Sequence, residues 1–486
     1  MQQTNDPADK ENTTFGHMIR KHTHEETHAA FTTARQAQQH RPTTSQLCAI
    51  FLRYHDLILQ EQTRLLDVIQ RESGKARSHA FDEVLDVAIT SRHYAKIAGK
   101  LLKEQRVKGA LPLLTSTTVQ REPHGVVGVI APWNYPLSLA VSDAIPALLA
   151  GNAVVLKPDL KTSETALLAA ELMYQAGLPR DLFQVITGTG SEVGQAIARE
   201  CDFLMFTGST ATGRKLGAIA GERLIGYSAE LGGKNPMIVD RTANLTAAAD
   251  IAVQACFANS GQLCISVERI YLHQDIAEAF TEQFVHKTQQ LSVGIGGWEY
   301  DMGSLISAEH ANKVHEFVKD AIDHGANVLT GAQPPQGALY QPTILANVPE
   351  TARLYHEEVF GPVVYLEIVA DETEAVNKAN ETEYGLNAAV VGKPAVARRI
   401  ARRLQAGTVN INEGFAAAWG SVAAPMGGWK ASGLGRRHGT EGLLKYTQPR
   451  TVAQQRVIPL TGPKNLRREE YARYMSAALR LGKRIL

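Results

Sequence analysis

The sequence predicts an α/β protein whose parallel sheets carry helices on both faces. Short apolar segments alternate with amphipathic segments at intervals of roughly 20–30 residues, as strands and helices do in a doubly wound sheet. The alternation runs through the first half of the chain and starts again in the second half. A chain of 486 residues is also too long for a single hydrophobic core. We therefore expect two α/β units of comparable size with a cleft between them.

Charge and cysteine content exclude several classes of protein. The 50 basic and 49 acidic residues give a net charge of +1, so nothing favours nucleic acid or an anionic membrane as a partner. The four cysteines form no CxxC motif and no Cys/His pair with zinc spacing, so we expect neither a disulfide framework nor a metal site. The sequence contains no run of 18 apolar residues and no visible secretory signal. A cytoplasmic protein is expected.

The elements of the first half are predicted as follows. Residues 1–40 are polar and rich in irregularly spaced histidines, which is typical of a solvated or frayed terminus. Apolar side chains recur every three or four positions in residues 45–105, which predicts antiparallel helices packed on a larger body. Strands are then predicted at 117–123, 125–132, 153–158, 183–187 and 203–206, with helices after each of the last four.

The second half repeats this alternation of strands and helices. It has predicted strands at 236–239, 269–272, 326–329 and 363–369, and predicted helices at 245–258, 276–290, 310–324 and 372–379. The chain ends in a β-rich segment, 448–457, and a basic, helix-like tail. Binding of this tail to a membrane surface is conceivable. We favour a solvated helix face because Glu469 and Glu470 interrupt the positive charge.

Two glycine-flanked turns carry a thiol and a carboxylate. Cys264 follows the turn Asn259-Ser260-Gly261-Gln262-Leu263, and Glu230 begins Glu230-Leu231-Gly232-Gly233-Lys234-Asn235-Pro236. Glycine lets the backbone approach a substrate closely. A thiol with a nearby carboxylate indicates a nucleophile and its base. Taken alone, a cysteine is more often a small core residue.

Four turns at the carboxyl ends of predicted strands carry candidate binding groups: Trp133-Asn134, Lys157, Ser209 and Glu230. Ligands of open α/β sheets bind at these ends. The Asn134 amide suits an oxyanion, although asparagine also forms turns before proline. Lys157 could bond ribose or phosphate, or it could be an ordinary strand-end lysine. Gly208-Ser209 could bind phosphate at a helix start, but neither this turn nor Gly188-Thr189-Gly190 matches the dinucleotide fingerprint.

Six motifs, in order, resemble those of the NAD(P)-dependent aldehyde dehydrogenase superfamily from about Arg35 to the end. They are Pro132-Trp133-Asn134-Tyr135-Pro136, Gly151-Asn152-Ala153-Val154-Val155-Leu156-Lys157-Pro158, Phe206-Thr207-Gly208-Ser209-Thr210, Glu230-Leu231-Gly232-Gly233-Lys234, Asn259-Ser260-Gly261-Gln262-Leu263-Cys264 and Glu358-Val359-Phe360-Gly361-Pro362. The resemblance implies a Rossmann-type cofactor domain, an α/β catalytic domain and a small β oligomerisation flap.

The resemblance also implies domain boundaries. Residues 1–107 and 126–231 would form the cofactor-binding domain, and 232–440 the catalytic domain. Residues 108–125 and 441–460 would form the oligomerisation segment, which pairs between subunits of a homodimer or homotetramer. Residues 461–486 would be the basic C-terminal tail.

The same resemblance implies the chemistry. Cys264 would attack the carbon of a small-molecule aldehyde, Asn134 and the backbone N–H of Cys264 would hold the oxyanion, and Glu230 would activate the water that releases the acid. A coenzyme-A-acylating relative would typically lack such a base. Nine residues would line the cofactor site: Trp133, Lys157, Gly190, Gly194, Ser209, Leu231, Gly232, Glu358 and Phe360. No metal would take part.

One position departs from the family pattern at the cofactor site. Many NAD-preferring members carry a glutamate three residues after the equivalent of Lys157, and here Leu160 stands there, followed by Lys161. Loss of that carboxylate removes repulsion against a 2′-phosphate. We therefore expect NADP or NAD as the cofactor, with NADP favoured, although the nearby Asp159 tempers this preference.

The sequence leaves two substrate classes open: succinate semialdehyde and uncharged aldehydes. Residues 225–230, 264–269 and 419–428 resemble the actinobacterial-type succinate-semialdehyde dehydrogenase branch. Well-understood members of that type carry two arginines that clamp the substrate carboxylate, at positions that are Ser142 and Ala258 here. The alternative is a broad-specificity enzyme for aromatic or aliphatic aldehydes, with Phe415 and Trp419 at the substrate mouth.

Two further hypotheses involve no such turnover. A structural protein could retain the fold without activity, although Cys264, Glu230 and Asn134 are all present. A redox sensor could pair Cys256 with Cys264, although a core role for Cys256 is the simpler interpretation.

Overall fold

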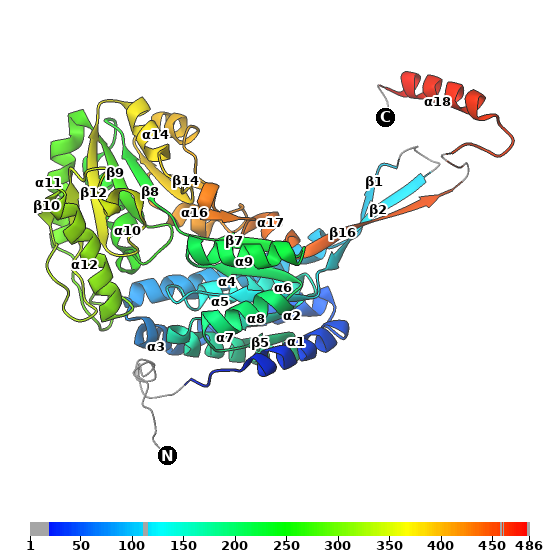
Figure 1. Cartoon of the computed structure of the whole chain (residues 1–486), viewed down its shortest axis with the longest axis horizontal. Helices are drawn as coiled ribbons and strands as arrows, with labels where there is room; N and C mark the ends of the chain where they lie inside the picture. The colour runs from blue at the N-terminus through cyan, green and yellow to red at the C-terminus, as the bar shows by residue number, and fades with distance from the viewer. Residues whose placement is uncertain (1–18, 110–114, 457–458, 460, 484–486) are drawn as a thin grey trace, which may run out of the picture.

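The computed structural model describes residues 19–109, 115–456, 459 and 461–483. Its strands form three sheets of six, seven and three strands. Figure 1 shows the six-stranded sheet and its helices in the middle, the seven-stranded sheet at one end, and the three-stranded sheet projecting from the other end. The two larger sheets confirm the predicted pair of α/β units.

The six-stranded sheet has the order β15-β7-β6-β3-β4-β5, and all its pairs are parallel except β15 with β7. Its strands are β3 (Val126–Ile130), β4 (Ala153–Lys157), β5 (Phe183–Val185), β6 (Phe203–Thr207), β7 (Gly226–Glu230) and β15 (Gly433–Leu434). The chain runs outward from β3 through β4 to β5, and then returns to β6 on the other side of β3. The direction of winding therefore reverses between β3 and β6, where ligands of such sheets bind.

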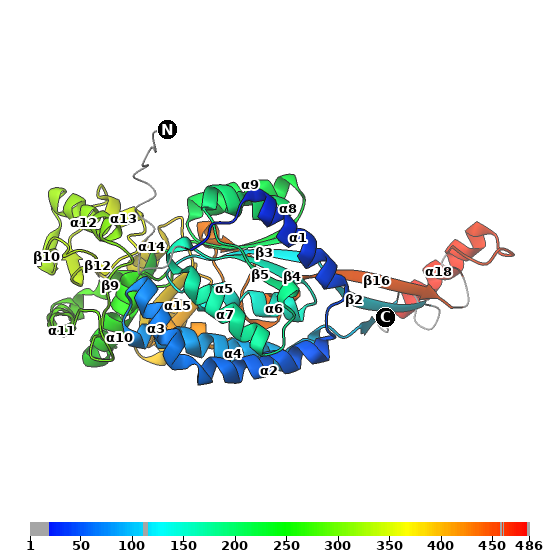
Figure 2. The same cartoon turned by 90° about the horizontal axis from the view of Figure 1, so that it is seen from below.

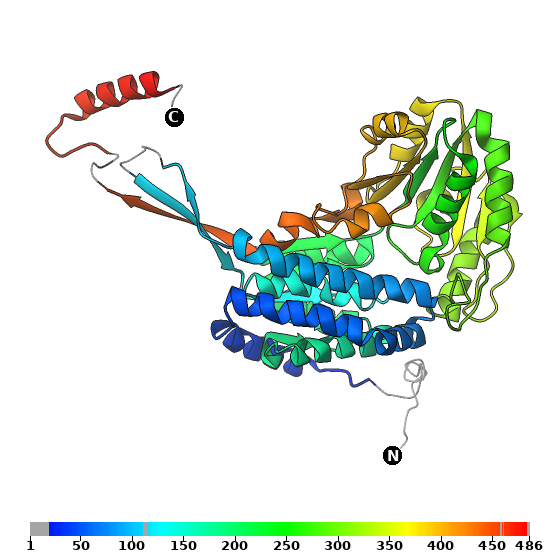
Figure 3. The same cartoon turned by 180° about the vertical axis from the view of Figure 1, so that it is seen from behind.

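Helices cover both faces of this sheet. Figure 2 shows α1 (His24–Gln39), α8 (Gln195–Glu200) and α9 (Thr210–Glu222) on one face. The other face carries α5 (Ser138–Val141), α6 (Ala144–Leu149) and α7 (Ser163–Gln175). An outer layer of three helices packs against these and is best seen in Figure 3: α2 (Thr44–Gln60), α3 (Gln62–Ser73) and α4 (Arg77–Leu101).

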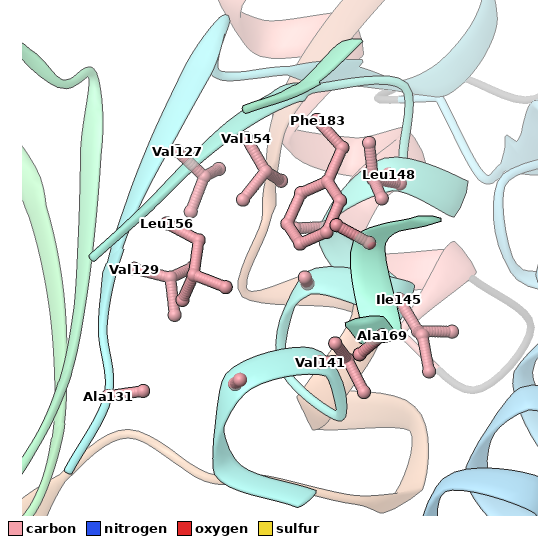
Figure 4. Close-up of a cluster of buried hydrophobic side chains, with 14 of the residues drawn as sticks. Val127, Val129, Ala131, Val141, Ile145, Leu148, Val154, Leu156, Ala169 and Phe183 are labelled. Carbon is pink, nitrogen blue, oxygen red and sulfur yellow. The ribbon is translucent and has the colours of Figure 1, made fainter. Parts of the chain in front are cut away.

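The central strands are buried along their whole length, as a parallel sheet between two helix layers requires. Every residue of β3, β4 and β6 is buried. In Figure 4, alternate side chains of β3 and β4 and one side chain of β5 point toward the helices beneath the sheet: Val127, Val129, Val154, Leu156 and Phe183 face Val141, Ile145, Leu148 and Ala169. This continuous core fixes the strand ends that carry Asn134 and Lys157.

The seven-stranded sheet has the order β10-β11-β12-β9-β8-β13-β14 and is parallel except for β10 with β11. Its strands are β8 (Asn235–Val239), β9 (Val267–His273), β10 (Asn327–Thr330), β11 (Thr343–Ala346), β12 (Val363–Val369), β13 (Asn387–Val391) and β14 (Thr408–Ile411). Met237 and Val239 of β8 face the cluster with α10 (Leu245–Phe257) and α11 (Ala277–Gln289). Ile238 faces α14 (Glu372–Asn380) and α15 (Pro394–Ala401) on the opposite face.

Shorter elements and one longer helix complete this part of the chain. Val314 and Val318 of α12 (Ala308–Asp323) pack with side chains of β11 and β12. The remaining helices are α13 (Arg353–His356), α16 (Ala416–Gly420) and α17 (Gly439–Leu444).

The three-stranded sheet, which we call the flap, is antiparallel. It contains β1 (Gln105–Val107), β2 (Thr115–Pro123) and β16 (Thr447–Gln455), and β2 pairs with β16 from Thr115↔Gln455 to Pro123↔Thr447. Figure 1 shows the flap reaching away from the body, with α18 (Arg468–Gly482) beyond it. Within the described chain, the outer edge of β16 has no strand partner.

The structure differs from the sequence predictions in two respects. Residues 24–39 form α1 rather than a solvated segment, because Ala30, Phe31 and Ala34 make a buried stripe against the sheet; residues 1–18 lie outside the described part. Six strands were not predicted: β1, β7, β11, β13, β14 and β15. The domain boundaries stay a prediction; β15, within residues 232–440, pairs with β7, and β1, within residues 1–107, pairs with β2 of the flap.

One negative finding concerns membranes. Of the helices in the described residues, none combines the length and the apolar character needed to cross a bilayer.

Candidate active site

The candidate site lies where the carboxyl edge of the six-stranded sheet meets the amino edge of the seven-stranded sheet. The chain itself makes the junction, because β7 ends at Glu230 and β8 begins at Asn235. Cys264 precedes β9, which pairs with β8, and Trp133 and Asn134 follow β3. The fold thus collects segments that are more than a hundred residues apart in sequence.

A pocket with about 450 Å³ of empty space opens at this junction. It brings together two of the three predicted catalytic residues, Asn134 and Cys264, and both aromatic residues predicted at the substrate mouth, Phe415 and Trp419. The full lining is Asp82, Asn134, Tyr135, Ser138, Leu139, Leu263, Cys264, Ile265, Phe415, Trp419, Met426 and Arg437. The wall is mostly apolar with a few polar groups, as is usual for small-molecule sites.

The turn before Cys264 is unusually tight. Asn259, Ser260 and Gly261 all have left-handed backbone angles, with φ of 50°, 55° and 69°. Ser260 Oγ donates a 2.9 Å hydrogen bond to the Gly303 carbonyl, which holds the turn. A side chain at Gly261 would overlap the backbone carbonyl of Gly361, so only glycine fits there.

Asn235 of β8 fixes the cysteine itself. Its Nδ2 donates to the Cys264 carbonyl at 2.8 Å and to the Ser266 carbonyl at 2.7 Å. The backbone at Cys264 is therefore held by the strand that follows Glu230, so one short segment connects the two catalytic candidates.

Asn134 is buried and held from both its ends. Its side-chain Nδ2 donates to the Gln262 carbonyl at 3.0 Å, and its backbone carbonyl accepts from Lys75 Nζ at 2.7 Å. Lys75 also forms a fully buried ion pair with Glu83, at 2.6 Å. The other oxygen of Glu83 accepts from the backbone N–H groups of Leu137 and Ser138. Lys75 and Glu83 were not predicted, because neither lies in a motif and their pairing depends on how α3, α4 and α5 pack.

Glu230 is buried, and its Oε1 has no hydrogen-bond partner in the described part of the chain. Burial raises its pKa to about 8, although the positive charges of Arg437 and Lys445 act in the opposite direction. Glu230 does not line the pocket. It lies close enough for its charge to help raise the pKa of Cys264. An unpartnered carboxylate with a raised pKa is the usual state of a general base.

The Cys264 thiol is protonated at neutral pH in this state. Burial, together with the carboxylates of Glu358 and Glu230, raises its pKa to about 12, while Arg437 acts in the opposite direction. Since the thiolate is the nucleophilic form, attack requires loss of this proton.

Arg437 belongs to a buried charged cluster behind the pocket. It forms an ion pair with Asp143 at 3.1 Å, and Lys445 contacts the other oxygen of Asp143 at 3.3 Å. Tyr446 donates its hydroxyl to Asp143 at 3.2 Å. Sequence analysis did not single out these residues. Two adjacent arginines just before α17, at 436 and 437, were the available signal.

Four of the predicted cofactor residues lie at or near the carboxyl edge of the six-stranded sheet. Lys157 ends β4, Gly190 and Gly194 follow β5, and Ser209 follows β6 as the N-cap of α9. The Lys157 side chain is buried, and within the described part of the chain its Nζ donates one hydrogen bond, of 2.8 Å, to the Pro158 carbonyl. An ammonium group has three donors, so two remain for a ligand. A side chain at Gly190 would meet no atom within 4 Å, which leaves the backbone open there.

The other cofactor candidates form a second group on the catalytic side. The rings of Trp133 and Phe360 lie 5.5 Å apart at 88°, and Phe360 has a left-handed φ of 57°. Glu358 accepts from the Gly233 N–H at 2.9 Å, and a side chain at Gly232 would overlap its carboxylate. Leu231 is buried, and its N–H donates to the Ser432 carbonyl at 2.9 Å.

A buried ion pair that sequence analysis missed holds this second group. Lys234 contacts Glu268 at 2.6 Å, and Glu268 accepts from the backbone N–H groups of Val359 and Phe360. The pair thus orients the segment that carries Glu358 and Phe360. It joins that segment to the strand β9 that follows Cys264.

These residues fit a nicotinamide dinucleotide. Unspent ammonium donors on Lys157, the exposed N-terminus of α9 at Ser209 and the open backbone at Gly190 suit phosphate and ribose groups. No group of three or more His, Cys, Asp or Glu side chains among the described residues could hold a metal ion. Fold and site together define a class: an α/β enzyme with a half-buried cysteine between a dinucleotide-type sheet and a second sheet.

Comparison with known proteins identifies the family. A family model described as "Aldehyde dehydrogenase family" matches residues 2–452. A protein of Mycolicibacterium smegmatis, named as a candidate succinate-semialdehyde dehydrogenase [NADP(+)], is 52% identical over 449 residues, which cover 91% of this chain and 87% of the relative. The chain belongs to the aldehyde dehydrogenase family.

Solved structures agree with this assignment. An E. coli structure described as an NADP-dependent enzyme has a TM-score of 0.86 at 32% identity, covering 90% of this chain and 92% of that one. Betaine aldehyde dehydrogenase from Staphylococcus aureus, solved in complex with NAD+, has a TM-score of 0.85 at 31% identity, covering 92% and 91%. The predicted fold and family are thereby confirmed.

Proposed function

We propose that the protein oxidises succinate semialdehyde to succinate through a covalent intermediate on Cys264, with NADP as the preferred oxidant. The observation that supports this most is the pocket in which Asn134 and Cys264 meet, with the buried, unpartnered Oε1 of Glu230 beside it. The names of the mycobacterial relatives supply the substrate and the cofactor.

Bond formation begins at sulfur. Cys264 Sγ, once deprotonated, attacks the aldehyde carbon, and the carbonyl oxygen becomes an oxyanion. One N–H of the Asn134 amide is used by Gln262, so the second is available for this oxyanion together with the backbone N–H of Cys264. The Lys75–Glu83 pair keeps the Asn134 backbone from shifting as charge develops.

The nicotinamide of NADP or NAD, when bound, supplies the hydride acceptor that converts the adduct on Cys264 into a thioester. Trp133, Gly190, Gly194, Ser209, Leu231, Gly232, Glu358 and Phe360 would hold it, together with Lys157. Lys161 is exposed, and its backbone N–H donates a 3.0 Å hydrogen bond to the Asp159 carboxylate. That bond ties down the Asp159 charge, which supports NADP over NAD next to Leu160.

Release of the acid requires a base. Glu230 accepts a proton from water as the water attacks the thioester carbon, and the thiolate of Cys264 leaves. Arg437 and Lys445 favour the ionised form of Glu230 and so keep its pKa within working range.

The protein is proposed to be a homo-oligomer that pairs through the flap. The flap extends from the body, and the edge of β16 is open in the described chain. Such an edge is a template for strand pairing. A homodimer or homotetramer follows from pairing of this kind.

A reducing, cytoplasmic setting is proposed from the cysteines. All four are free thiols, and Cys201 and Cys256 are buried in separate core clusters. Free thiols persist in reducing compartments.

A steady-state assay of reduced-cofactor absorbance tests the function. NADP and NAD are each paired with succinate semialdehyde, benzaldehyde and hexanal, and Cys264→Ala is the control. We expect the highest kcat/KM with succinate semialdehyde and NADP, and no turnover by C264A. Absence of turnover with every pair would sink the catalytic proposal, as would full activity of C264A.

The second candidate is an enzyme for uncharged aldehydes. Phe415 and Trp419 line the pocket, and Ser142 and Ala258 provide no cation. A clearly higher kcat/KM for hexanal or benzaldehyde than for succinate semialdehyde in the same assay would favour it.

A further inference from the structure

The pocket contains a cation where the sequence suggested none. Ser142 and Ala258, at the positions of the expected arginines, do not replace it: Ser142 Oγ donates to Asp86 Oδ2 at 2.6 Å, and Ala258 is a buried alanine. Among the described residues that line the pocket, Arg437 carries the positive charge.

The guanidinium of Arg437 has donors to spare. The residue is 8% exposed and its ion pair with Asp143 measures 3.1 Å. No hydrogen bond from its side chain to any described residue is present, while a guanidinium carries five N–H donors in a planar fork. Buried polar groups normally find partners, so unused donors on a residue that lines the pocket indicate a missing acceptor.

The charge on this arginine is secure. Burial disfavours the cation, but Asp143 and Glu230 outweigh it and raise the pKa of Arg437 above its ordinary value. Asp143 also contacts the Lys445 ammonium group and accepts a hydrogen bond from Tyr446. Its negative charge is therefore shared and does not fully neutralise Arg437. Arg437 is thus a fixed cation at every working pH.

We propose that Arg437 is the specificity residue that binds the distal carboxylate of a carboxylated aldehyde whose carbonyl carbon sits at Cys264. The fork geometry matches a carboxylate, and the apolar wall of Leu139, Ile265 and Phe415 suits the methylene groups between the two ends. Arg437 takes over the role of the absent clamp. This inference rests on the proposed function.

A neighbouring carboxylate sharpens the discrimination. Asp82 also lines the pocket, and burial raises its pKa to about 6, so at neutral pH its charge opposes an anionic substrate. Without Arg437 the pocket would therefore repel carboxylated aldehydes rather than merely ignore them.

The test compares succinate semialdehyde with butanal, which has the same chain length and no carboxylate. Arg437→Met keeps the side-chain bulk, and Arg437→Lys keeps the charge beside Asp143 while losing the fork. Arg398→Met, on the exposed face of α15, is the matched control. The ratio of the two kcat/KM values should fall about 10- to 100-fold in R437M and about tenfold in R437K, mainly through KM, and stay constant in R398M.

Two readouts separate this inference from the proposed function and from a structural role. Titration of succinate into the protein without cofactor reads the carboxylate site directly, and binding should be lost in R437M and R437K. A thermal unfolding midpoint of R437K close to that of the wild type excludes misfolding. Turnover of butanal by the wild type tests aldehyde oxidation itself, independently of the carboxylate site. Unchanged selectivity or unchanged succinate binding in either variant overturns the assignment, even if aldehyde oxidation itself is established.

Discussion

Glu230 has to lose a proton before it can take one from water. Its pKa is raised to about 8, mainly by burial, so the ionised form falls away as pH drops below that value. The rate of acid release should therefore rise with pH through an apparent pKa near 8 and level off above it. Glu230→Gln should lower kcat by about 10²–10⁴-fold and flatten this limb. Measurement of kcat between pH 6 and about 10 decides; a limb that persists in E230Q would assign the titration to another group.

Leu160 stands where a carboxylate would repel a 2′-phosphate. Leu160→Glu should lower kcat/KM for NADP by about tenfold or more and leave the value for NAD within about threefold, because it adds one like charge beside Lys161. Leu160→Gln, with the same shape and no charge, is the control. Equal loss for both cofactors in L160E would show that position 160 acts through packing and not through charge.

Residue types predicted much of the site, but not the support around it. Cys264, Asn134 and Glu230 stand in recognisable motifs; Asn134 and Glu230 lie at strand ends, and Cys264 lies in the turn before β9. Their roles stay predictions. The roles of four other residues depend on buried ion pairs or on partners more than fifty residues away in the sequence: Lys75, Glu83, Asp143 and Arg437. No spacing in the sequence marks such partners.

At the scale of elements, the turn from Ala258 to Gly261 controls where the thiol points. Gly261→Ala would combine left-handed strain with overlap on the Gly361 carbonyl. We expect a loss of about 3 kcal/mol or more in the free energy of unfolding, and a fall in kcat of at least about tenfold.

A second glycine separates the two contributions. Gly337 has a similar φ of 62°, is exposed, and would meet no atom within 4 Å. Gly337→Ala should cost only about 1 kcal/mol of strain and keep full activity. Denaturant unfolding and kcat of both variants provide the comparison. Equal stability of the two variants would mean that the Gly261 contact relaxes.

Elements were predictable where burial and periodicity coincide. β3, β4, β6 and β12 are continuous apolar runs, and they were found. β7 reads Gly-Tyr-Ser-Ala-Glu, and β14 reads Thr-Val-Asn-Ile, so their pairing is decided by neighbouring strands and not by local pattern. α1 was missed because its apolar stripe is only a few small or isolated residues within a polar segment.

For the whole molecule, assembly is proposed to depend on the flap and not on the tail. A chain that ends at Arg456 keeps β16 and loses α18, whereas a chain that ends at Tyr446 loses both. The first should keep the oligomeric mass of the full chain, and the second should sediment as a monomer, because the strand edge is gone. Analytical ultracentrifugation distinguishes them. An oligomer that survives loss of residues 447–486 would place the interface elsewhere.

In the proposed mechanism, Cys264 carries the acyl group and Glu230 governs its release. Intact-mass and peptide mass spectrometry of E230Q, quenched after incubation with succinate semialdehyde and NADP, tests both roles at once. We expect one succinyl group per chain, on the peptide that contains Cys264, and its absence from Cys264→Ala carrying the same E230Q change. An unmodified chain that nevertheless turns over, or a succinyl group on any other residue, would contradict it.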